Sequence, residues 1–338
     1  MHTMRKIINA PEAFVEETME GILCAYGDRV KLLDGDHRIL LANAQAPKGK
    51  VGIVTGGGSG HLPVFLGYVG QGMLDGCAVG NVFASPSAQR MAEAIKACDF
   101  GGGVLCLYGN YGGDKMNFDM ACEECEFDGV QTKSVRMSDD VASAAKQDAD
   151  KRRGVAGLVY AFKTAGAAAE KMMSLDEVAA IAQKTVDHTR SMGVALSPCI
   201  VPEVGTPTFS IQPDEIEIGM GIHGEPGIEV RKMMTADEIA ETVLDRILED
   251  MPLRSGDEVS VMVNGLGATP MEELLIVFRR VHRLLKERGV SIYMPHIGEF
   301  ATSMEMAGMS LTLLKLDAQL KELLRAPAST PFYTNANK

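Results

Sequence analysis

The sequence lacks any dense cluster of lysine and arginine. Its 33 basic residues stand against 45 acidic residues, which leaves a formal net charge of -12. A chain whose main partner is nucleic acid or an anionic membrane needs a positive surface, and this composition excludes that class of function. A small molecule or another protein is the partner that the charge balance favours.

Long hydrophobic runs are also missing, because a glycine or a charged residue interrupts every apolar stretch before it reaches membrane-spanning length. The first residues, MHTMRKIINAPEAFVEE, lack the continuous apolar segment of a secretory signal. We therefore expect a cytoplasmic protein. Hydrophobic residues make up 46% of the 338 positions. This length and composition are sufficient for a large core and favour two α/β domains over one.

Cysteine is sparse and unevenly placed. The seven cysteines are odd in number and scattered, which is not the pattern of a disulfide framework, so we expect them to be reduced. One CxxC spacing occurs, at Cys122 and Cys125. These two residues continue a helical apolar stripe with Phe118 and Ala121, and no second cysteine pair completes a tetrahedral site. The sequence therefore predicts core packing here, and no metal.

Two nucleotide-binding fingerprints are absent. No GxxxxGK[ST] motif occurs in the chain. A GxGxxG reading that begins at Gly56 and Gly58 fails because its third position is His61, whose side chain would obstruct close packing of helix and strand. A nicotinamide-dependent oxidoreductase is therefore not expected, and a phosphoryl-transfer enzyme would need its nucleotide held elsewhere.

Strand and helix patterns alternate along the chain. They predict buried strands at 50–55, 104–108 and 130–137, further strands at 258–263, 291–294 and 310–316, and a long amphipathic helix over 270–288. This alternation predicts an α/β fold of two domains, each with a mostly parallel or mixed sheet. The segment 197–213 is rich in proline and glycine, so we divide the chain into an N-terminal domain, 1–196, and a C-terminal domain, 197–338.

Several helix starts carry local capping signals. Ser85 precedes a proline, which suits the first turn of a helix. Ser174, Thr235 and Thr269 are each followed three residues later by glutamate, the spacing of a capping box. The sequence therefore predicts helices that begin after each of these four residues.

Three glycine-rich segments combine small residues with one ionisable side chain each. They are GGGSGHLP at 56–63 with His61, GNYGGDK at 109–115 with Asp114, and GMGIHGEPG at 219–227 with His223. A glycine cluster after a strand is often only a tight turn, and a single histidine is more often structural than catalytic. Three such loops together predict one site for acid–base or nucleophilic chemistry at the carboxyl ends of strands.

A set of longer motifs resembles the substrate-binding subunit of dihydroxyacetone kinases. The set includes GGGSGHLPVFLGYVGQGMLDGCAVGNVFASPS, NYGGDKMNF, RRGVAGLVYAFKTAGAAAE, GMGIHGEPG and AGMSLTLL. The resemblance extends from about Lys6 to the TPFY segment, nearly the whole chain. It implies a two-domain α/β subunit, usually a homodimer, that holds a short ketose.

The resemblance also implies a division of roles within the site. His223 would form a covalent hemiaminal with the ketone, and His61 and Asp114 would bind the substrate hydroxyls and act as acid and base. Residues expected to line the substrate are Gly57, Gly58, Ser59, Gly60, His61, Gly109 and Asp114, with main-chain amides near Gly58 and Ser59 facing the sugar.

The same resemblance implies that the phosphate donor lies on another protein. This chain would bind no cofactor or metal itself. A separate helical subunit would carry Mg-bound ATP, or ADP that a phosphotransferase-system protein recharges.

Two departures from the family pattern bear on substrate choice. Leu62 stands where the family commonly has glutamate, and Gly109 stands where it commonly has lysine. Both remove a charge, which favours a related or larger ketose such as erythrulose, with dihydroxyacetone also open. An alternative function is a non-catalytic ketose-sensing coactivator of transcription. Retention of His61, Asp114 and His223 favours the enzyme, because a sensor needs no base.

Overall fold

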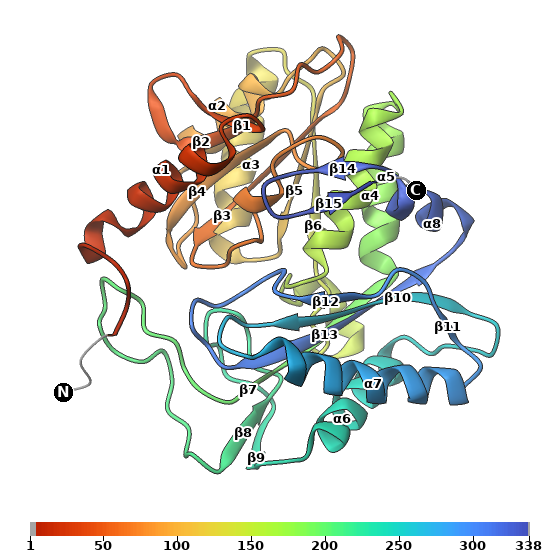
Figure 1. Ribbon diagram of the computed structural model, residues 1–338. Coiled ribbons are helices and arrows are strands. Elements are labelled where there is room, and N and C mark those ends of the chain that lie inside the picture. Colours follow the sequence, from red (N-terminus) through yellow and green to blue (C-terminus); the bar gives the residue numbers. More distant parts are fainter. Residues whose placement is uncertain (1–4, 337–338) are drawn as a thin grey trace.

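The protein consists of two α/β halves stacked one above the other, in a computed structural model that describes residues 5–336 (Figure 1). The first half is built on a sheet with strand order β1-β2-β4-β3-β5-β6. Its strands are β1 (Val30–Leu33), β2 (Asp36–Ala42), β3 (Gly52–Ser59), β4 (Gly76–Val82), β5 (Val104–Gly109) and β6 (Thr132–Met137). The strands from β4 through β6 pair in parallel, and β1 and β2 form an antiparallel edge.

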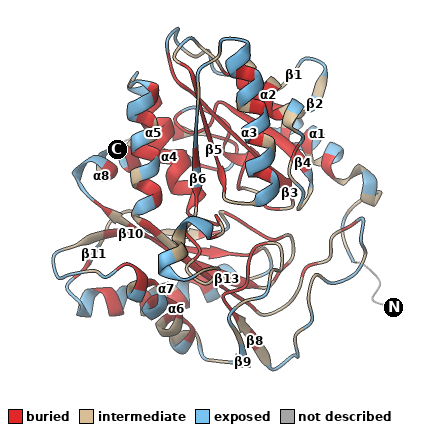
Figure 2. Ribbon diagram, turned by 180° about the vertical axis from the view of Figure 1, so that it is seen from behind, coloured by how far each residue is buried: buried red, intermediate tan, exposed pale blue. Residues whose placement is uncertain are grey.

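Helices cover both faces of this first sheet. The elements of this half are η1 (Pro11–Ala13), α1 (Phe14–Tyr26), η2 (Leu66–Tyr68), α2 (Ala88–Ala97), α3 (Gly112–Phe127), η3 (Lys146–Lys151), α4 (Leu158–Glu170) and α5 (Leu175–Asp187). Helices α2 and α3 pack on one face, and α4 and α5 pack on the other. Figure 2 shows α4 buried along nearly all of its length. Strands β3 and β5 are consequently buried throughout, which explains their continuous runs of small and apolar residues.

The second half has a mixed sheet with order β11-β10-β13-β7-β8-β9, and β12 also pairs with β10. Its elements are β7 (Thr189–Ala195), β8 (Glu215–Ile218), β9 (Glu229–Lys232), α6 (Ala236–Asp250), β10 (Glu258–Gly265), α7 (Met271–Glu287), β11 (Ser291–Ile292), β12 (His296–Gly298) and β13 (Gly308–Leu316). Helices α6 and α7 cover its outer face. The inner face contributes Met262 and Leu314 to the core of the first half, so the two halves share apolar packing.

The α/β class predicted from the sequence is confirmed, and the second sheet differs in strand direction from simple β-α-β alternation. Its β10 is parallel only to β11 and β12, which follow α7, whereas β13, β7, β8 and β9 pair antiparallel. A parallel neighbour requires a crossover connection, and the segment between β12 and β13 contains no helix. The chain therefore returns antiparallel.

Two of the four predicted helix caps are confirmed, and the helices predicted at the other two positions also form, beginning at Ala88 and Met271. Ser174 and Thr235 form capping boxes at the starts of α5 and α6. The capping box predicted at Thr269 is wrong, because its hydroxyl donates a hydrogen bond of 2.7 Å to the carbonyl of Gly308 and the residue before α7 is Pro270. The prediction at Ser85 is also wrong, because Ser87 caps α2.

The division of the chain at residue 196 stays a prediction. Strand β7, which precedes it, already belongs to the second sheet. After β13 the chain returns to the first half through α8 (Ala318–Arg325), β14 (Ala328–Ser329) and β15 (Thr334–Asn335), where α8 packs on α4. The predicted cysteine stripe is confirmed as core at Phe118, Ala121 and Cys125, which are fully buried, whereas Cys122 is only partly buried and packs against the same core. No helix within residues 5–336 is long and apolar enough to cross a membrane.

Candidate functional site

The three ionisable residues singled out in the sequence come from three separate elements. His61 follows the end of β3, Asp114 lies in the first turn of α3, and His223 lies in the loop between β8 and β9. The rings of His61 and His223 meet edge to face with centroids 4.7 Å apart. The pKa of the Asp114 carboxyl responds to the charged form of His223, so Asp114 belongs to the same site. The structure thus joins a strand end of the first half to a loop of the second.

His61 is buried and held in one tautomer. Its side chain is 1% exposed, and Nδ1 donates a hydrogen bond of 2.7 Å to the carbonyl oxygen of Thr302. Because a carbonyl oxygen can only accept, Nε2 is left as an unprotonated acceptor, and Nε2 has no partner among the described residues. Burial, together with the nearby charge of His223, lowers the pKa of His61 to about 3. His61 is therefore a neutral hydrogen-bond acceptor at physiological pH.

His223 is the accessible member of the pair. Its side chain is 24% exposed, and its Nδ1 lies 2.9 Å from Oε1 of Glu225. The main-chain amide of His223 donates to the other carboxylate oxygen at 2.9 Å. Burial raises the pKa of Glu225, but the hydrogen bond and charge of His223 outweigh it and hold that pKa at about 2. Glu225 is therefore an ionised acceptor to which the Nδ1–H of His223 donates, which leaves Nε2 of His223 free to act as a nucleophile.

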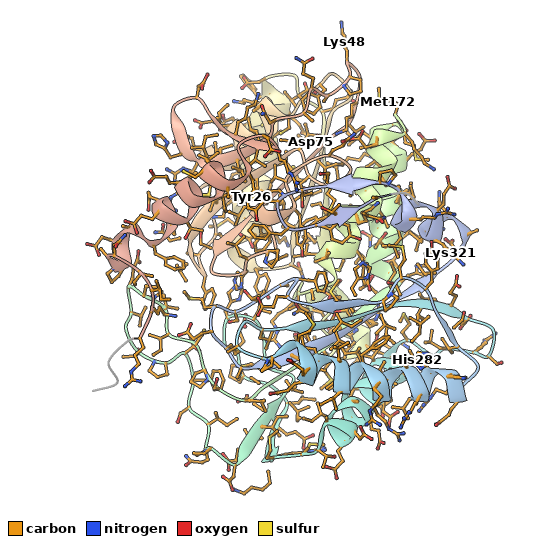
Figure 3. The ribbon with its side chains drawn as sticks, viewed as in Figure 1. Tyr26, Lys48, Asp75, Met172, His282 and Lys321 are labelled. Atoms are coloured by element: carbon orange, nitrogen blue, oxygen red, sulfur yellow. The ribbon has the colours of Figure 1, made fainter. Side chains whose placement is uncertain are left out.

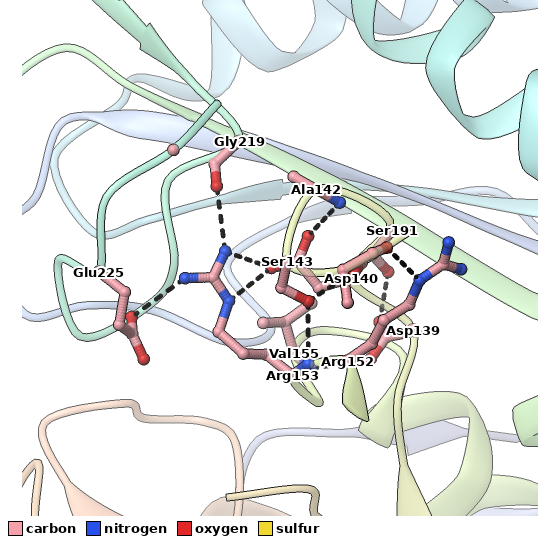
Figure 4. A network of polar contacts seen from close by, with 12 residues as sticks. Asp139, Asp140, Ala142, Ser143, Arg152, Arg153, Val155, Ser191, Gly219 and Glu225 are labelled. Atoms are coloured by element: carbon pink, nitrogen blue, oxygen red, sulfur yellow. Dashed lines mark hydrogen bonds and ion pairs between the residues drawn. The ribbon is translucent and has the colours of Figure 1, made fainter. Parts of the chain in front are cut away.

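Glu225 is itself tied to the body of the protein through Arg153 (Figure 4). Nη1 of Arg153 lies 3.9 Å from Glu225, and Nη2 lies 2.8 Å from the buried carboxylate of Asp140. The same guanidinium donates to the carbonyl of Gly219 at 3.1 Å, at the start of the loop that carries His223. This network fixes the loop and the carboxylate that orients the histidine.

Asp114 carries an unsatisfied carboxylate. Its residue is 5% exposed, and Oδ1 has no hydrogen-bond partner among the described residues. Burial raises the pKa of Asp114 to about 6, and a hydrogen bond from Ser85 and the charge of His223 limit that rise. A carboxylate with this pKa is mostly ionised at neutral pH and can accept a proton.

The glycine run before His61 has a different structural setting from the expected open loop. Residues 56–59 are part of β3 and are buried. A Cβ at Gly57 would come 2.4 Å from the ring of Phe65, and one at Gly58 would come 2.7 Å from the backbone nitrogen of Ala84. These glycines therefore admit close packing of neighbouring segments. Their role as substrate-lining residues, with that of Ser59 and Gly60, stays a prediction; the Ser59 hydroxyl already donates to the carbonyl of Gly80 at 2.8 Å.

Aromatic rings enclose the histidine pair. Phe83 stacks on His61 with centroids 4.6 Å apart, and Tyr111 meets His223 edge to face at 4.8 Å. A Cβ at Gly109 would approach the Tyr111 ring to 3.1 Å. Absence of a side chain at Gly109 is thus what lets Tyr111 lie against it, and the Tyr111 hydroxyl is buried without a partner among the described residues.

Sequence reasoning gave no role to four residues of this site: Phe83, Tyr111, Arg153 and Glu225. All four lie inside the motifs that carry the family resemblance, so the sequence marked these positions without indicating their chemistry. Thr302 had no local signal, because it is 241 positions from the histidine it orients. Within residues 5–336, no group of three or more His, Cys, Asp or Glu side chains is placed to hold a metal ion.

An α/β fold with polar groups converging where strands end is typical of an enzyme or binding protein for a small molecule. The model of the Dak1 domain family matches residues 20–332. The chain therefore belongs to the dihydroxyacetone kinase family, through its Dak1 domain.

Two curated relatives and one solved structure illustrate the range of this family. The dihydroxyacetone-binding subunit DhaK of a PTS-dependent dihydroxyacetone kinase from Listeria innocua is 44% identical and covers 98% of this chain and 99% of its own length. An L-erythrulose kinase from Pectobacterium atrosepticum is 42% identical over 98% of this chain, which spans 56% of that protein. The dihydroxyacetone kinase operon co-activator Dha-DhaQ has a TM-score of 0.89 at 32% identity, with 95% and 98% of the two chains covered.

Proposed function

We propose that this chain is the ketose-binding subunit of a kinase for short-chain ketoses, and that it binds the ketose covalently through His223. The observation that carries the proposal is the approach of the His61 and His223 rings to 4.7 Å, with Nε2 of His61 and Oδ1 of Asp114 unpartnered among the described residues and Nδ1 of His223 held by Glu225. A small polyhydroxylated ketone offers an electrophilic carbon and several hydroxyl groups, which matches these groups in number and chemistry.

The covalent step uses the free nitrogen of His223. The Nε2 lone pair forms a bond to the carbonyl carbon, the carbonyl π pair moves to oxygen, and that oxygen takes up a proton. The Nδ1 proton passes to solvent or to the alkoxide by way of Glu225, so the imidazole ends neutral and charge is balanced. Glycerol has no carbonyl carbon and cannot form this bond, so the site would discriminate by chemistry.

Asp114 and His61 would serve the hydroxyl that receives phosphate. His61 presents an acceptor nitrogen, and Asp114 presents a carboxylate whose pKa of about 6 suits it to take the hydroxyl proton. Phosphoryl transfer depends mostly on positioning and charge stabilisation. The donor, Mg-bound ATP or ADP recharged by a phosphotransferase system, would be held by a separate helical subunit. We also retain the predicted homodimer as part of this proposal.

The substrate is proposed to be dihydroxyacetone or a four-carbon relative such as erythrulose. Gly109 stands where the family commonly has a lysine, so the cation is absent, and the Tyr111 ring lies against the position that a Cβ would occupy. Leu62 lines an apolar cavity of about 160 Å³ with Phe14 and Met304, where a carboxylate would have apolar neighbours. Turnover of the two ketones with a supplied nucleotide-bearing subunit tests this choice. A strong preference for dihydroxyacetone would defeat the idea of a larger ketose.

The covalent proposal is tested with a ketose labelled with ¹³C at the carbonyl carbon. On mixing with native protein, the labelled signal should leave the ketone region and appear in the tetrahedral region, and a crystal soak should show density joining the sugar to His223. The tetrahedral signal should be absent from His223→Ala. The matched control is His282→Ala, which should keep the signal because His282 is exposed on the outer face of α7 (Figure 3). A signal that stays in the ketone region with native protein contradicts covalent capture.

A second candidate function is a ketose-sensing coactivator of transcription. The similarity to the co-activator Dha-DhaQ supports it, since that chain shares the fold at a TM-score of 0.89. A sensor needs capture of the ketose without a base for the phosphorylated hydroxyl. Phosphorylated ketose formed with a nucleotide-bearing subunit would support the kinase; capture without any turnover would support the sensor.

A further inference from the structure

Two cysteine thiols face each other across the contact between β5 and α3. Sγ of Cys106, on β5, lies 3.7 Å from Sγ of Cys122, on α3. Cys106 is fully buried, whereas Cys122 is partly exposed. The pair therefore joins an inner thiol to one that a small reagent in solvent can reach.

The neighbouring Cys125 points elsewhere. Its Sγ lies 3.6 Å from the carbonyl oxygen of Ala92 on α2, and Cys125 is fully buried. Cys122 and Cys125 share one helix, and their side chains are directed to different partners. The geometry thus selects Cys106 as the partner of Cys122, although the sequence spacing suggests the CxxC pair.

The surroundings of Cys122 favour its thiolate. A hydrogen bond with Cys106 is the largest influence; burial opposes it, and hydrogen bonds with Thr132 and Ser134 reinforce it, which lowers the pKa of Cys122 to about 7. Ser134 Oγ lies 3.8 Å from Cys122 Sγ. The pKa of Cys106 is instead raised, first by its hydrogen bond with Cys122 and then by burial. A half-exposed thiolate beside a second thiol is the arrangement of an attacking and a resolving cysteine.

We propose that Cys106 and Cys122 form a modification site at which a hydroperoxide produces a reversible disulfide between β5 and α3. The thiolate of Cys122 attacks the peroxide oxygen, the O–O bond breaks, and hydroxide leaves, which gives a sulfenic acid. The sulfur of Cys106 then attacks that sulfenic sulfur, and its proton and the departing hydroxide form water. Overall two thiols and one hydrogen peroxide give one disulfide and two waters, with the thiols oxidised and the peroxide reduced.

The disulfide would act on the ends of β5 and α3 that reach the functional site. Bond formation draws the sulfurs from 3.7 Å to about 2.0 Å, so the helix or the strand must shift. Asp114 lies on α3 eight residues before Cys122, about 12 Å along the helix axis. Gly109 is the last residue of β5. This consequence rests on the proposed function, whereas formation of the disulfide does not.

Peptide mapping tests the pair itself. Protein with Cys24→Ser, which removes an exposed thiol, is treated with hydrogen peroxide, alkylated after unfolding and digested without reductant. We expect a cross-linked peptide pair containing Cys106 and Cys122 that is lost after dithiothreitol. A bridge between Cys122 and Cys125, or irreversible oxidation of Cys122 with Cys106 still alkylated, overturns the proposal.

Two variants separate chemistry from folding. Cys125→Ala should retain the cross-link, because Cys125 does not take part. Cys106→Ala should lose the cross-link and accumulate sulfenic or sulfinic acid at Cys122. Loss of the cross-link in Cys125→Ala, with native-like circular dichroism, would show that Cys125 takes part in the disulfide and would overturn the assignment to Cys106.

Turnover with a supplied nucleotide-bearing subunit tests the link to Asp114. We expect oxidation to lower turnover by up to about 100-fold, since small misplacements of a positioned group have effects of that size, and dithiothreitol to restore it. Peroxide-treated Cys106→Ala should stay near its untreated rate. Unchanged turnover in a fully cross-linked sample overturns the link to Asp114. Absent turnover in the reduced protein overturns the kinase proposal instead, while the mapping still decides the disulfide.

Discussion

The end of β3 and the loop between β8 and β9 each present one histidine to the same site, and they prepare it differently. His61 is 1% exposed and donates Nδ1–H to a main-chain carbonyl. The His223 side chain is 24% exposed and donates Nδ1–H to a carboxylate. A neutral partner in a buried place makes His61 a fixed acceptor, whereas an ionised partner in an accessible place increases the electron density on the free nitrogen of His223. The two histidines thus have different chemical roles because different groups accept the hydrogen bond from Nδ1.

The largest effect is expected for His223→Ala. Without the Nε2 atom no carbon–nitrogen bond to the ketose can form, so the adduct and turnover should both be abolished. The ¹³C experiment and a turnover assay with a supplied nucleotide-bearing subunit measure the two effects. His61→Ala provides the contrast between the two regions: its adduct should persist, and loss of the adduct there would mean that the two histidines have been assigned in reverse.

Asp114→Asn should retain the adduct and lower turnover by roughly 10²–10⁴-fold, the usual contribution of a general base. Because the pKa of Asp114 is raised to about 6, native turnover should rise with pH through that value as the carboxyl ionises. The variant should lack this rise. Asp119→Asn, an exposed position on the same helix, is the control; a pH profile in Asp114→Asn identical to the native one contradicts the role.

Glu225→Gln should slow adduct formation by about 10- to 100-fold, which corresponds to the about 1.5–3 kcal/mol of a hydrogen bond to a charged group. The amide keeps the shape and removes the charge that favours proton release from Nδ1. Rapid mixing with labelled ketose measures the rate. Glu203→Gln, at an exposed position, should leave it unchanged. Equal rates in native protein and Glu225→Gln would show that this carboxylate does not prepare the nucleophile.

The smallest effect at neutral pH concerns His61 and folding stability. Its pKa falls from the usual 6.5 to about 3, so the unfolded chain binds a proton that the folded chain excludes. Stability from this group is complete above pH 6.5 and is lost as pH falls from 6.5 toward 3, by at most about 1.4 kcal/mol per pH unit. Urea unfolding should show that the free energy of unfolding of His61→Gln falls less steeply with decreasing pH over this window than that of the native protein. His282→Gln is the control and should behave as the native protein does. Equal pH dependence in the native protein and His61→Gln argues against a buried neutral His61.

The sequence motifs correctly indicated the family, the α/β class and most core strands. The strand predicted at 104–108 is an apolar run flanked by turn residues, and it forms β5, which is buried throughout. The strand predicted at 130–137 forms as β6, but only Val135 and Met137 are buried there, so the prediction of a buried strand is wrong at that edge of the sheet. Capping at Ser174 and Thr235 was equally local. Thr269 failed because its hydroxyl pairs with Gly308, a strand neighbour whose position no local pattern reveals.

The glycines of β3 show a second limit of sequence reasoning. A run of glycines in the sequence predicts a loop with an exposed backbone. In the structure, Gly57 and Gly58 lie in the buried strand β3, and Phe65 and the segment at Ala84 pack against them. These positions are glycine because neighbouring segments occupy the space that a side chain would need. The same holds for Gly109, whose vacant Cβ position adjoins the Tyr111 ring.

By itself, the sequence determined the acidic character of the protein, its alternation of strands and helices, and the kinds of acid–base side chain that its glycine-rich segments carry, because these properties depend on residue identity and local spacing. Only the tertiary structure decided which nitrogen of His61 is free, which carboxylate prepares His223, and which thiol faces Cys122. Each of these depends on atoms that are distant in sequence and brought together by the two sheets, where a few ångströms determine hydrogen bonding and burial determines charge.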